Sequence, residues 1–249
     1  GPQGLYIAVQ KDMAPLRSAL QKAMNQVPNR EKVRLARKWI TIDRSPAPAL
    51  TKKEKEFLEN NQVLRVDSMS WWPPFNFREN DKAKGFSIDY MRLLAQKLDI
   101  RLEFATADSW GEYMDMLQNG DLDVLCDVVE TARRTKKIDF TRPYFMVFTG
   151  IVSKKENNDF RDLASLSGEK VAVPESFYHE EILKREYPEI EVVTRKNTLE
   201  CLKSVSSGQT AAALAEKPVF DYLIKKHFLM DLQTVPIMDN PHFENTPVS

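Results

Sequence analysis

The stretch at residues 120–144, GDLDVLCDVVETARRTKKIDFTRPY, carries side chains that can bind an anion. It predicts a buried strand at residues 122–128 that ends in a polar turn with Thr131, Arg133 and Arg134. An arginine there is a permanently charged bidentate donor at the carboxyl edge of a sheet, where open α/β sheets bind ligands. We expect an anion-binding turn; a surface turn with solvated arginines is the alternative that this stretch leaves open.

A second candidate binding feature is the aromatic run WWPPF at residues 71–75, which follows a predicted strand at 63–66. Its two prolines exclude a helix or a central strand, so the run must form a loop. Aromatic rings on a rigid loop can stack on a ligand. We expect at least one of the two tryptophans to fill the lobe instead.

Length and charge limit the classes of function. A chain of 249 residues with 42% hydrophobic residues can form one large domain or two lobes with a buried core. Its 36 basic residues balance its 36 acidic residues, so no overall charge favours nucleic acid or an anionic membrane. A small ligand of mixed charge fits this composition better.

Cysteine and histidine usage gives no sign of a metal site, and no cofactor is expected. Cys126 falls in an apolar strand pattern and Cys201 in a helical one, so both are interpreted as core thiols. His179, His227 and His242 lack the spacing of metal ligands.

Strands and helices alternate along most of the chain. Beyond residue 60, strands are predicted at 63–66, 100–104 and 122–128, with helices after Gly85 and Ser109. An extended run at 145–153 leads to further strands at 171–173, 190–194, 211–215 and 232–237, separated by helices at 177–187, 197–205 and 218–226. The pattern predicts two α/β lobes, each with a parallel or mostly parallel sheet covered by helices, joined by a crossing near residues 148–152.

The first part of the chain has a different pattern. A strand at residues 5–9 and two helical stripes precede a proline-broken linker at 45–50, after which Thr51 and Glu54 form a predicted capping box. We therefore divide the chain into residues 1–45, a first lobe at 46–148, and a second lobe with a hinge return at 149–249.

Five motifs, in order, carry a family resemblance: WPPFNF from Trp72, GFSIDYMRLLAQKL from Gly85, GDLDVLCDVVETARR with FTRPYF, DLASLSGEKVAV from Asp162, and AAALAEKPVFDYLIKK from Ala211. The chain resembles the type II periplasmic solute-binding proteins for polar amino acids, and most closely the Venus-flytrap sensor domains of histidine kinases and related signalling proteins. The resemblance implies a two-lobed α/β fold with a hinged cleft and a periplasmic or otherwise extracytoplasmic location.

The resemblance also implies roles for individual residues. Arg134 matches the arginine that binds the ligand carboxylate, Thr131 matches the threonine of the same turn, and Trp72 matches the aromatic that covers the ligand. Glu216 stands where the family usually has an aspartate that pairs with the α-amino group. Further expected pocket residues are Met69, Trp110 and Tyr178, together with Ser176 and Phe177, whose backbone N–H groups lie at a helix start.

Two positions depart from the family pattern. Val129 replaces a hydroxyl that often helps to hold the carboxylate, and Asp127 stands at a position that is usually small or hydroxylated. Asp127 either receives a second cationic group or pairs with Arg134 and weakens anion binding. Both alternatives remain open from the sequence. In either case we expect the ligand to carry at least one cationic nitrogen, and dicarboxylates to bind poorly.

The strand and helices at residues 5–42 resemble the segment that ends such domains and completes the first lobe. Their position at the front implies either circular permutation or the tail of a preceding tandem domain. We expect them to pack on the first lobe of some copy of the domain, because the apolar helix stripe needs a partner.

The expected function is a non-catalytic sensor domain that closes on an amino acid or a similar zwitterion and signals to a membrane-attached partner. Delivery of an amino acid to an ABC permease is the first alternative. A cyclohexadienyl dehydratase-like enzyme that uses Glu216, Lys217 or His179 is the second. Catalysis is disfavoured because the sequence shows no nucleophile paired with a base, no metal-ligand spacing and no phosphate loop.

Overall fold

The computed structural model describes residues 14–28, 31, 48–157, 159–237 and 246–248, and the chain divides into two units, residues 1–48 and 49–249. The first unit contains helix α1 (Ala14–Gln26), on which Leu16 and Met24 are exposed. The predicted strand at 5–9 and most of the second helical stripe lie outside the described residues. The expected packing of residues 5–42 therefore stays a prediction.

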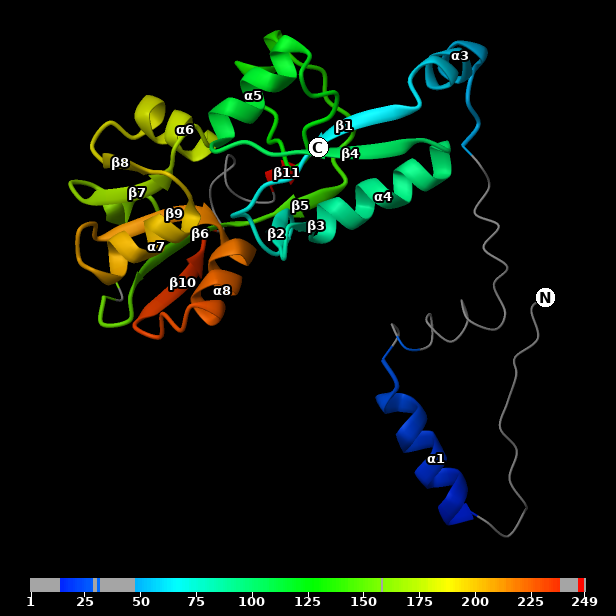
Figure 1. The fold of residues 1–249 in the computed structure, drawn as a ribbon. Coiled ribbons are helices and arrows are strands. Elements are labelled where there is room, and N and C mark those ends of the chain that lie inside the picture. The colour runs from blue at the N-terminus through cyan, green and yellow to red at the C-terminus, as the bar shows by residue number, and fades with distance from the viewer. Residues whose placement is uncertain (1–13, 29–30, 32–47, 158, 238–245, 249) are drawn as a thin grey trace. The chain divides into compact units, whose positions relative to one another are not determined.

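The first lobe of the second unit is built around two parallel strands (Figure 1). Capping side chains begin two of its helices as predicted, because Thr51 and Glu54 form the capping box and Ser109 accepts a hydrogen bond from the N–H of Glu112. The strands are β1 (Val63–Asp67) and β4 (Arg101–Ala105), the hairpin is β2 (Phe77–Glu79) and β3 (Lys82–Lys84), and the helices are α3 (Lys52–Asn60), α4 (Phe86–Leu98) and α5 (Trp110–Asn119).

The prediction of a strand at residues 122–128 is wrong. Only Val124 pairs, as an isolated bridge to Val66 of β1. Asp127 then has a φ of 64°, a left-handed conformation that is incompatible with a continuing strand. The segment is therefore a buried loop, followed by the short 3-10 helix η1 (Arg134–Lys136).

The second lobe contains one five-stranded sheet in the order β10-β6-β9-β7-β8. Strand β7 runs parallel to β8 and β9, whereas β6 runs antiparallel to β9 and β10. Because β10 and β9 are both antiparallel to β6, β10 runs in the same direction as β7, β8 and β9. The expected mostly parallel sheet is therefore confirmed for this lobe, and β6 is the strand of this sheet that runs in the opposite direction. The strands are β6 (Thr149–Lys154), β7 (Lys170–Pro174), β8 (Glu191–Arg195), β9 (Ala212–Glu216) and β10 (Leu232–Pro236).

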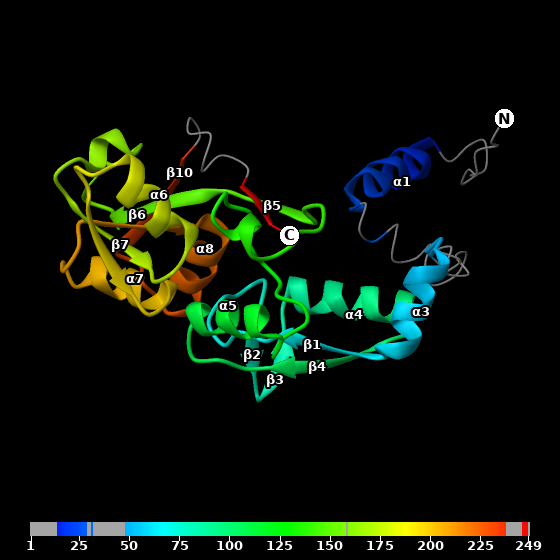
Figure 2. The same cartoon turned by 90° about the horizontal axis from the view of Figure 1, so that it is seen from above.

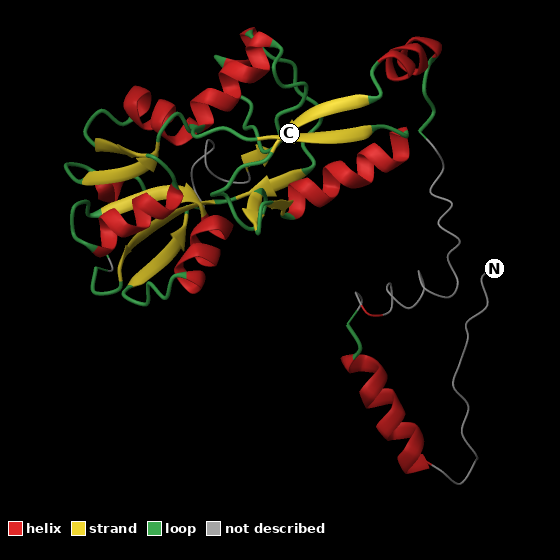
Figure 3. Ribbon diagram, in the orientation of Figure 1, coloured by secondary structure: helices red, strands yellow, loops and turns green. Residues whose placement is uncertain are grey.

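Alternating side chains bury both faces of this sheet. Val171 and Val173 of β7 join a core with helix α6, whereas Ala172 between them joins the core with α7 and α8. Figure 3 shows the helices around this sheet. The helices are α6 (Tyr178–Glu186), α7 (Thr198–Ser206) and α8 (Lys217–Lys226), and the short 3-10 helix η2 (Ala164–Leu166) precedes β7.

The chain leaves the first lobe through β5 (Phe145–Val147) and enters the second directly through β6, as Figure 2 shows. Strand β11 (Thr246–Val248) pairs with β5 in antiparallel register. The extended run predicted at 145–153 is thus two strands, which meet at Phe148. Within residues 49–237, this is where the chain passes from one lobe to the other.

Gly85 holds the aromatic loop against the start of α4. It has a φ of 121°, and an added Cβ would lie 2.0 Å from the carbonyl oxygen of Phe75. We expect Gly85→Ala to lower the free energy of unfolding by about 1–3 kcal/mol from backbone strain alone. Urea denaturation measures this loss. Gly168→Ala is the matched control, because Gly168 also has a positive φ but nothing within 4 Å of its Cβ position; an equal loss in both variants would contradict the clash.

Candidate functional site

A small closed cavity collects most of the predicted site residues from both lobes. Its volume is about 10 Å³. Thr131 and Ser176 are the predicted residues that do not line it. The lining residues are Met69, Trp72, Trp110, Asp127, Val129 and Arg134 of the first lobe and Phe177, Tyr178 and Glu216 of the second.

Direct contacts between the lobes close this cavity. Trp72 Nε1 donates to Glu216 Oε2 at 3.2 Å, and Arg134 Nη2 donates to the carbonyl of Ser176 at 3.3 Å. The rings of Trp110 and Phe177 lie 5.7 Å apart. A cavity of about 10 Å³ is near the lower limit for one water molecule. A ligand the size of an amino acid can therefore enter only if the lobes separate.

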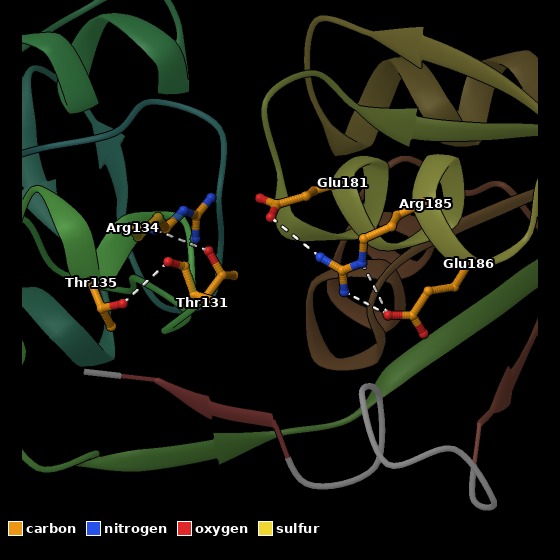
Figure 4. Close-up of polar contacts among 7 residues, drawn as sticks. Thr131, Arg134, Thr135, Glu181, Arg185 and Glu186 are labelled. Carbon is orange, nitrogen blue, oxygen red and sulfur yellow. Dashed lines mark hydrogen bonds and ion pairs between the residues drawn. The ribbon is translucent and has the colours of Figure 1, made fainter.

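Arg134 is a buried cation, with 8% of its surface exposed. The turn before it holds its backbone, because Arg134 N donates to the carbonyl of Thr131 at 2.9 Å and lies 3.3 Å from the Thr131 hydroxyl (Figure 4). Its Nη1 donates to the carbonyl of Val129 at 2.8 Å, and its guanidinium lies over the ring of Trp110. Burial lowers the pKa of Arg134, partly offset by Glu181, yet an arginine stays protonated. The solvated-arginine alternative is wrong for Arg134 and describes the exposed Arg133 instead.

Glu216 is a buried carboxylate from the opposite lobe. It ends strand β9 and is the N-cap residue of α8, with 2% of its surface exposed. The pKa of Glu216 is raised to about 7, mainly by burial and to a smaller extent by Asp127, although the hydrogen bond from Trp72 lowers it. The Trp72 indole N–H therefore binds the carboxylate that is expected to hold the α-amino group of a ligand.

Asp127 does not pair with Arg134. Ser87 Oγ and Tyr144 Oη both donate to its Oδ1, and burial raises the pKa of Asp127 to about 6. Ser87 and Tyr144 were not predicted as site residues, since they lie 40 and 17 positions away in the chain. The signal in the sequence is an aspartate inside the apolar run at residues 122–128, because a carboxylate buried with that run needs hydrogen-bond donors.

A second acid lies behind Asp127. Asp67 is fully buried and accepts hydrogen bonds from Cys126 N at 2.7 Å and from the Asn76 amide at 2.6 Å. Burial, and then the nearby Asp127, raise the pKa of Asp67 to about 8. Cys126 and Cys201 are buried and free, so their interpretation as core thiols is confirmed.

His179 and Lys217, the other two residues considered for catalysis, have partners of their own. His179 lies 3.1 Å from the Thr149 hydroxyl, and burial lowers the pKa of His179 to about 3. Lys217 pairs with the exposed Asp221 one turn along α8. Neither residue lines the cavity.

The two backbone N–H groups expected to meet a ligand carboxylate are already used. Ser176 N donates to Glu180 Oε2 at 2.8 Å, and Phe177 N donates to the carbonyl of Pro174 at 3.3 Å. Ser176 has a φ of 63° and lies outside the cavity. These amides become available to a ligand only if this turn rearranges.

An outer groove of about 760 Å³ adjoins the closed cavity. Arg134 and Phe177 line both spaces, so these two side chains separate the cavity from the groove. Figure 4 shows Arg134 with Thr131 on one side and Glu181 and Arg185 of α6 on the other. The groove thus lies directly outside the closed cavity, with Arg134 at the boundary.

Within the described ranges, no group of three or more histidine, cysteine, aspartate or glutamate residues is placed to hold a metal ion. The same ranges contain no helix with the length and apolarity to cross a lipid bilayer.

Comparison with curated proteins finds two informative relatives. The chain is 32% identical over 171 residues to the probable amino-acid-binding protein YxeM of Bacillus subtilis, a match over 68% of this chain and 64% of YxeM. It is 24% identical over 247 residues to the virulence sensor protein BvgS of Bordetella bronchiseptica, a match over 97% of this chain and 20% of BvgS. The chain thus spans about two thirds of the first relative and about a fifth of the second.

Among solved structures, an ancestral arginine-binding protein bound to arginine superposes with a TM-score of 0.67 at 29% identity, over 75% of this chain and 83% of that protein. The family model of bacterial extracellular solute-binding proteins, family 3, matches residues 64–229. That match covers most of the two lobes and the residues of the cavity. This chain therefore belongs to the bacterial extracellular solute-binding proteins of family 3, which confirms the predicted two-lobed fold and the extracytoplasmic location.

Proposed function

We propose that this chain is the extracytoplasmic ligand-binding part of a sensor, and that it closes its two lobes on an amino acid or a similar small zwitterion. The observation that carries the proposal is the pairing of opposite charges across one cavity. Arg134 of the first lobe and Glu216 of the second are both buried and both line it. A ligand with a carboxylate and an amino group bridges the lobes by neutralising both.

The ligand replaces contacts that the protein makes with itself. A ligand carboxylate takes the guanidinium of Arg134, whose Nη2 bonds the Ser176 carbonyl only at 3.3 Å. An α-amino group takes Glu216 in place of the neutral Trp72 indole. Both exchanges replace a hydrogen bond that has one charged partner by one in which both partners are charged, which favours the ligand-bound closed state.

The longer of the two matches favours a sensor over a transport protein. The match to BvgS runs through 247 residues in one continuous order and so includes the segment before residue 46, whereas the match to YxeM spans 171 residues. This supports interpreting residues 1–45 as the end of a preceding tandem domain rather than as a permuted terminus. The partner that responds to closure of the lobes is then a membrane-attached signalling protein. Delivery to a permease is the alternative, and the identity with an amino-acid-binding protein favours it.

The proposed role is non-catalytic. The cavity lining contains neither His179 nor Lys217, and it offers no serine, threonine or cysteine nucleophile. Its charged groups are one cation and two carboxylates beside aromatic rings, a set suited to binding.

A screen of the purified protein tests the binding proposal. We expect at least one amino acid, present at 100 times its Kd, to add about 2.7 kcal/mol to the free energy of unfolding, seen as a rise in melting temperature. Succinate should give a smaller shift, because its second carboxylate meets Glu216 without a cation. Calorimetric titration then gives the affinities. Tighter binding of succinate than of every amino acid would refute the proposed charge pairing.

A further inference from the structure

Asp127 has a carboxylate oxygen that its own neighbours leave unused. The hydroxyls of Ser87 and Tyr144 both bond Oδ1, at 2.5 and 2.7 Å. Oδ2 is fully buried and has no hydrogen-bond partner among the described residues, and the residue as a whole is 7% exposed. An unpaired buried carboxylate oxygen is costly. A donor from a ligand in the cavity would satisfy it.

The charges that line the cavity do not balance. Arg134 supplies one positive charge, whereas Glu216 and Asp127 supply two negative charges when both are ionised. Asp67 behind them is neutral at pH 7, since its pKa lies at about 8, and the pKa of the buried Cys126 thiol is also raised, so it adds no charge. A zwitterion adds no net charge and leaves one buried anion unpaired. A ligand with one extra positive charge makes the closed cavity neutral.

We propose that Asp127 forms a second cation subsite beside Glu216, so that the preferred ligand is an amino acid whose side chain carries its own cationic nitrogen. This inference rests on the proposed function, because Arg134 and Glu216 must hold the α-carboxylate and the α-amino group. Ser87 and Tyr144 position the subsite by fixing Oδ1, which leaves Oδ2 for the ligand.

The protonation state of Asp127 should affect the affinities for cationic and neutral ligands differently. Burial sets the pKa of Asp127 at about 6, with Ser87, Tyr144 and Asn76 lowering it, although the Asn76 amide itself donates to Asp67. A cationic side chain requires ionised Asp127, so its affinity rises as pH increases through about 6. A neutral side chain is best accepted by protonated Asp127 and gains nothing from that rise. Titration of Glu216, whose pKa is about 7, affects both ligands alike because both carry an α-amino group.

Two pairs of nearly isosteric ligands provide the test. L-arginine and L-citrulline differ in one charged nitrogen, and L-lysine and L-norleucine differ in one terminal ammonium group. Calorimetric titration of the full chain should give roughly tenfold or tighter binding of the cationic member of each pair, a preference that grows from pH 5 to pH 7. Asp127→Asn should bring both ratios close to one and abolish their pH dependence. The control Asp121→Asn removes an exposed carboxylate and should leave both ratios unchanged.

Each outcome decides between the two proposals. If citrulline and norleucine bind as tightly as their cationic partners, or if the preference survives in Asp127→Asn, the subsite is refuted while the amino-acid site stands. If none of the four ligands binds the wild type but another amino acid of the screen does, the subsite is refuted and the amino-acid site stands. If no amino acid binds, both proposals fail. The melting temperature of Asp127→Asn shows whether it folds. If that variant does not fold, the wild-type ratios and their growth between pH 5 and pH 7 still decide the question.

Discussion

Arg134→Ala is expected to lower the affinity for an amino acid by about thirtyfold or more. Removing one partner of a buried hydrogen-bonded charge pair costs on the order of 2 to 5 kcal/mol, because the ligand carboxylate is left desolvated without a counter-charge. Arg134 is suited to this role because it is 8% exposed and lies at the boundary between the outer groove and the closed cavity. Calorimetric titration with the best ligand of the screen measures the loss.

Arg133→Ala is the matched control for this variant. Arg133 is the preceding arginine in the same turn, but it is exposed and lines the outer groove without reaching the cavity. Its removal should change affinity little, and that small change should shrink with added salt because the charge is screened. Equal losses in the two variants would show that the carboxylate binds in the groove rather than in the cavity.

The domain is also expected to lose stability as the pH rises from about 5 to about 8. In the folded state the pKa of Asp67 is raised from 3.8 to about 8 by burial and by Asp127. Between these values the unfolded chain releases the proton that the folded chain keeps, so a higher pH favours unfolding. One such group contributes about 1.4 kcal/mol per pH unit. Asp127 and Glu216, with pKa values of about 6 and 7, act in the same direction at lower pH.

Urea denaturation at intervals between pH 5 and pH 8 measures this slope. Asp67→Asn removes the titrating group and should flatten the slope by about one proton, most clearly above pH 7. Asp121→Asn removes an exposed carboxylate and should leave the slope as in the wild type. A free energy of unfolding that increases from pH 5 to pH 8 would mean that Asp67 is ionised in the folded protein.

The order of strands and helices could be predicted because each element carries its own signal. Thr51, Ser109 and Asn197 cap helices at their predicted positions, each with a glutamate three residues later. The strands of the second lobe follow apolar runs such as the one at β9, whose residues are all buried. Strand direction has no such local signal, which is why the antiparallel insertion of β6 was missed.

The sequence by itself also predicted three side chains that line the closed cavity, because Arg134, Glu216 and Trp72 stand in the motifs that carry the family resemblance. Only the tertiary structure decided what each group contacts. In the structure the Trp72 indole donates to Glu216, and Asp127 has a left-handed backbone conformation in a loop rather than lying in a strand. Ser87 and Tyr144 both donate to one carboxylate oxygen of Asp127. The physical reason is that hydrogen bonds of buried polar groups are settled between residues far apart in the chain, once packing has excluded water. No pattern in the sequence alone predicts those hydrogen-bond partners.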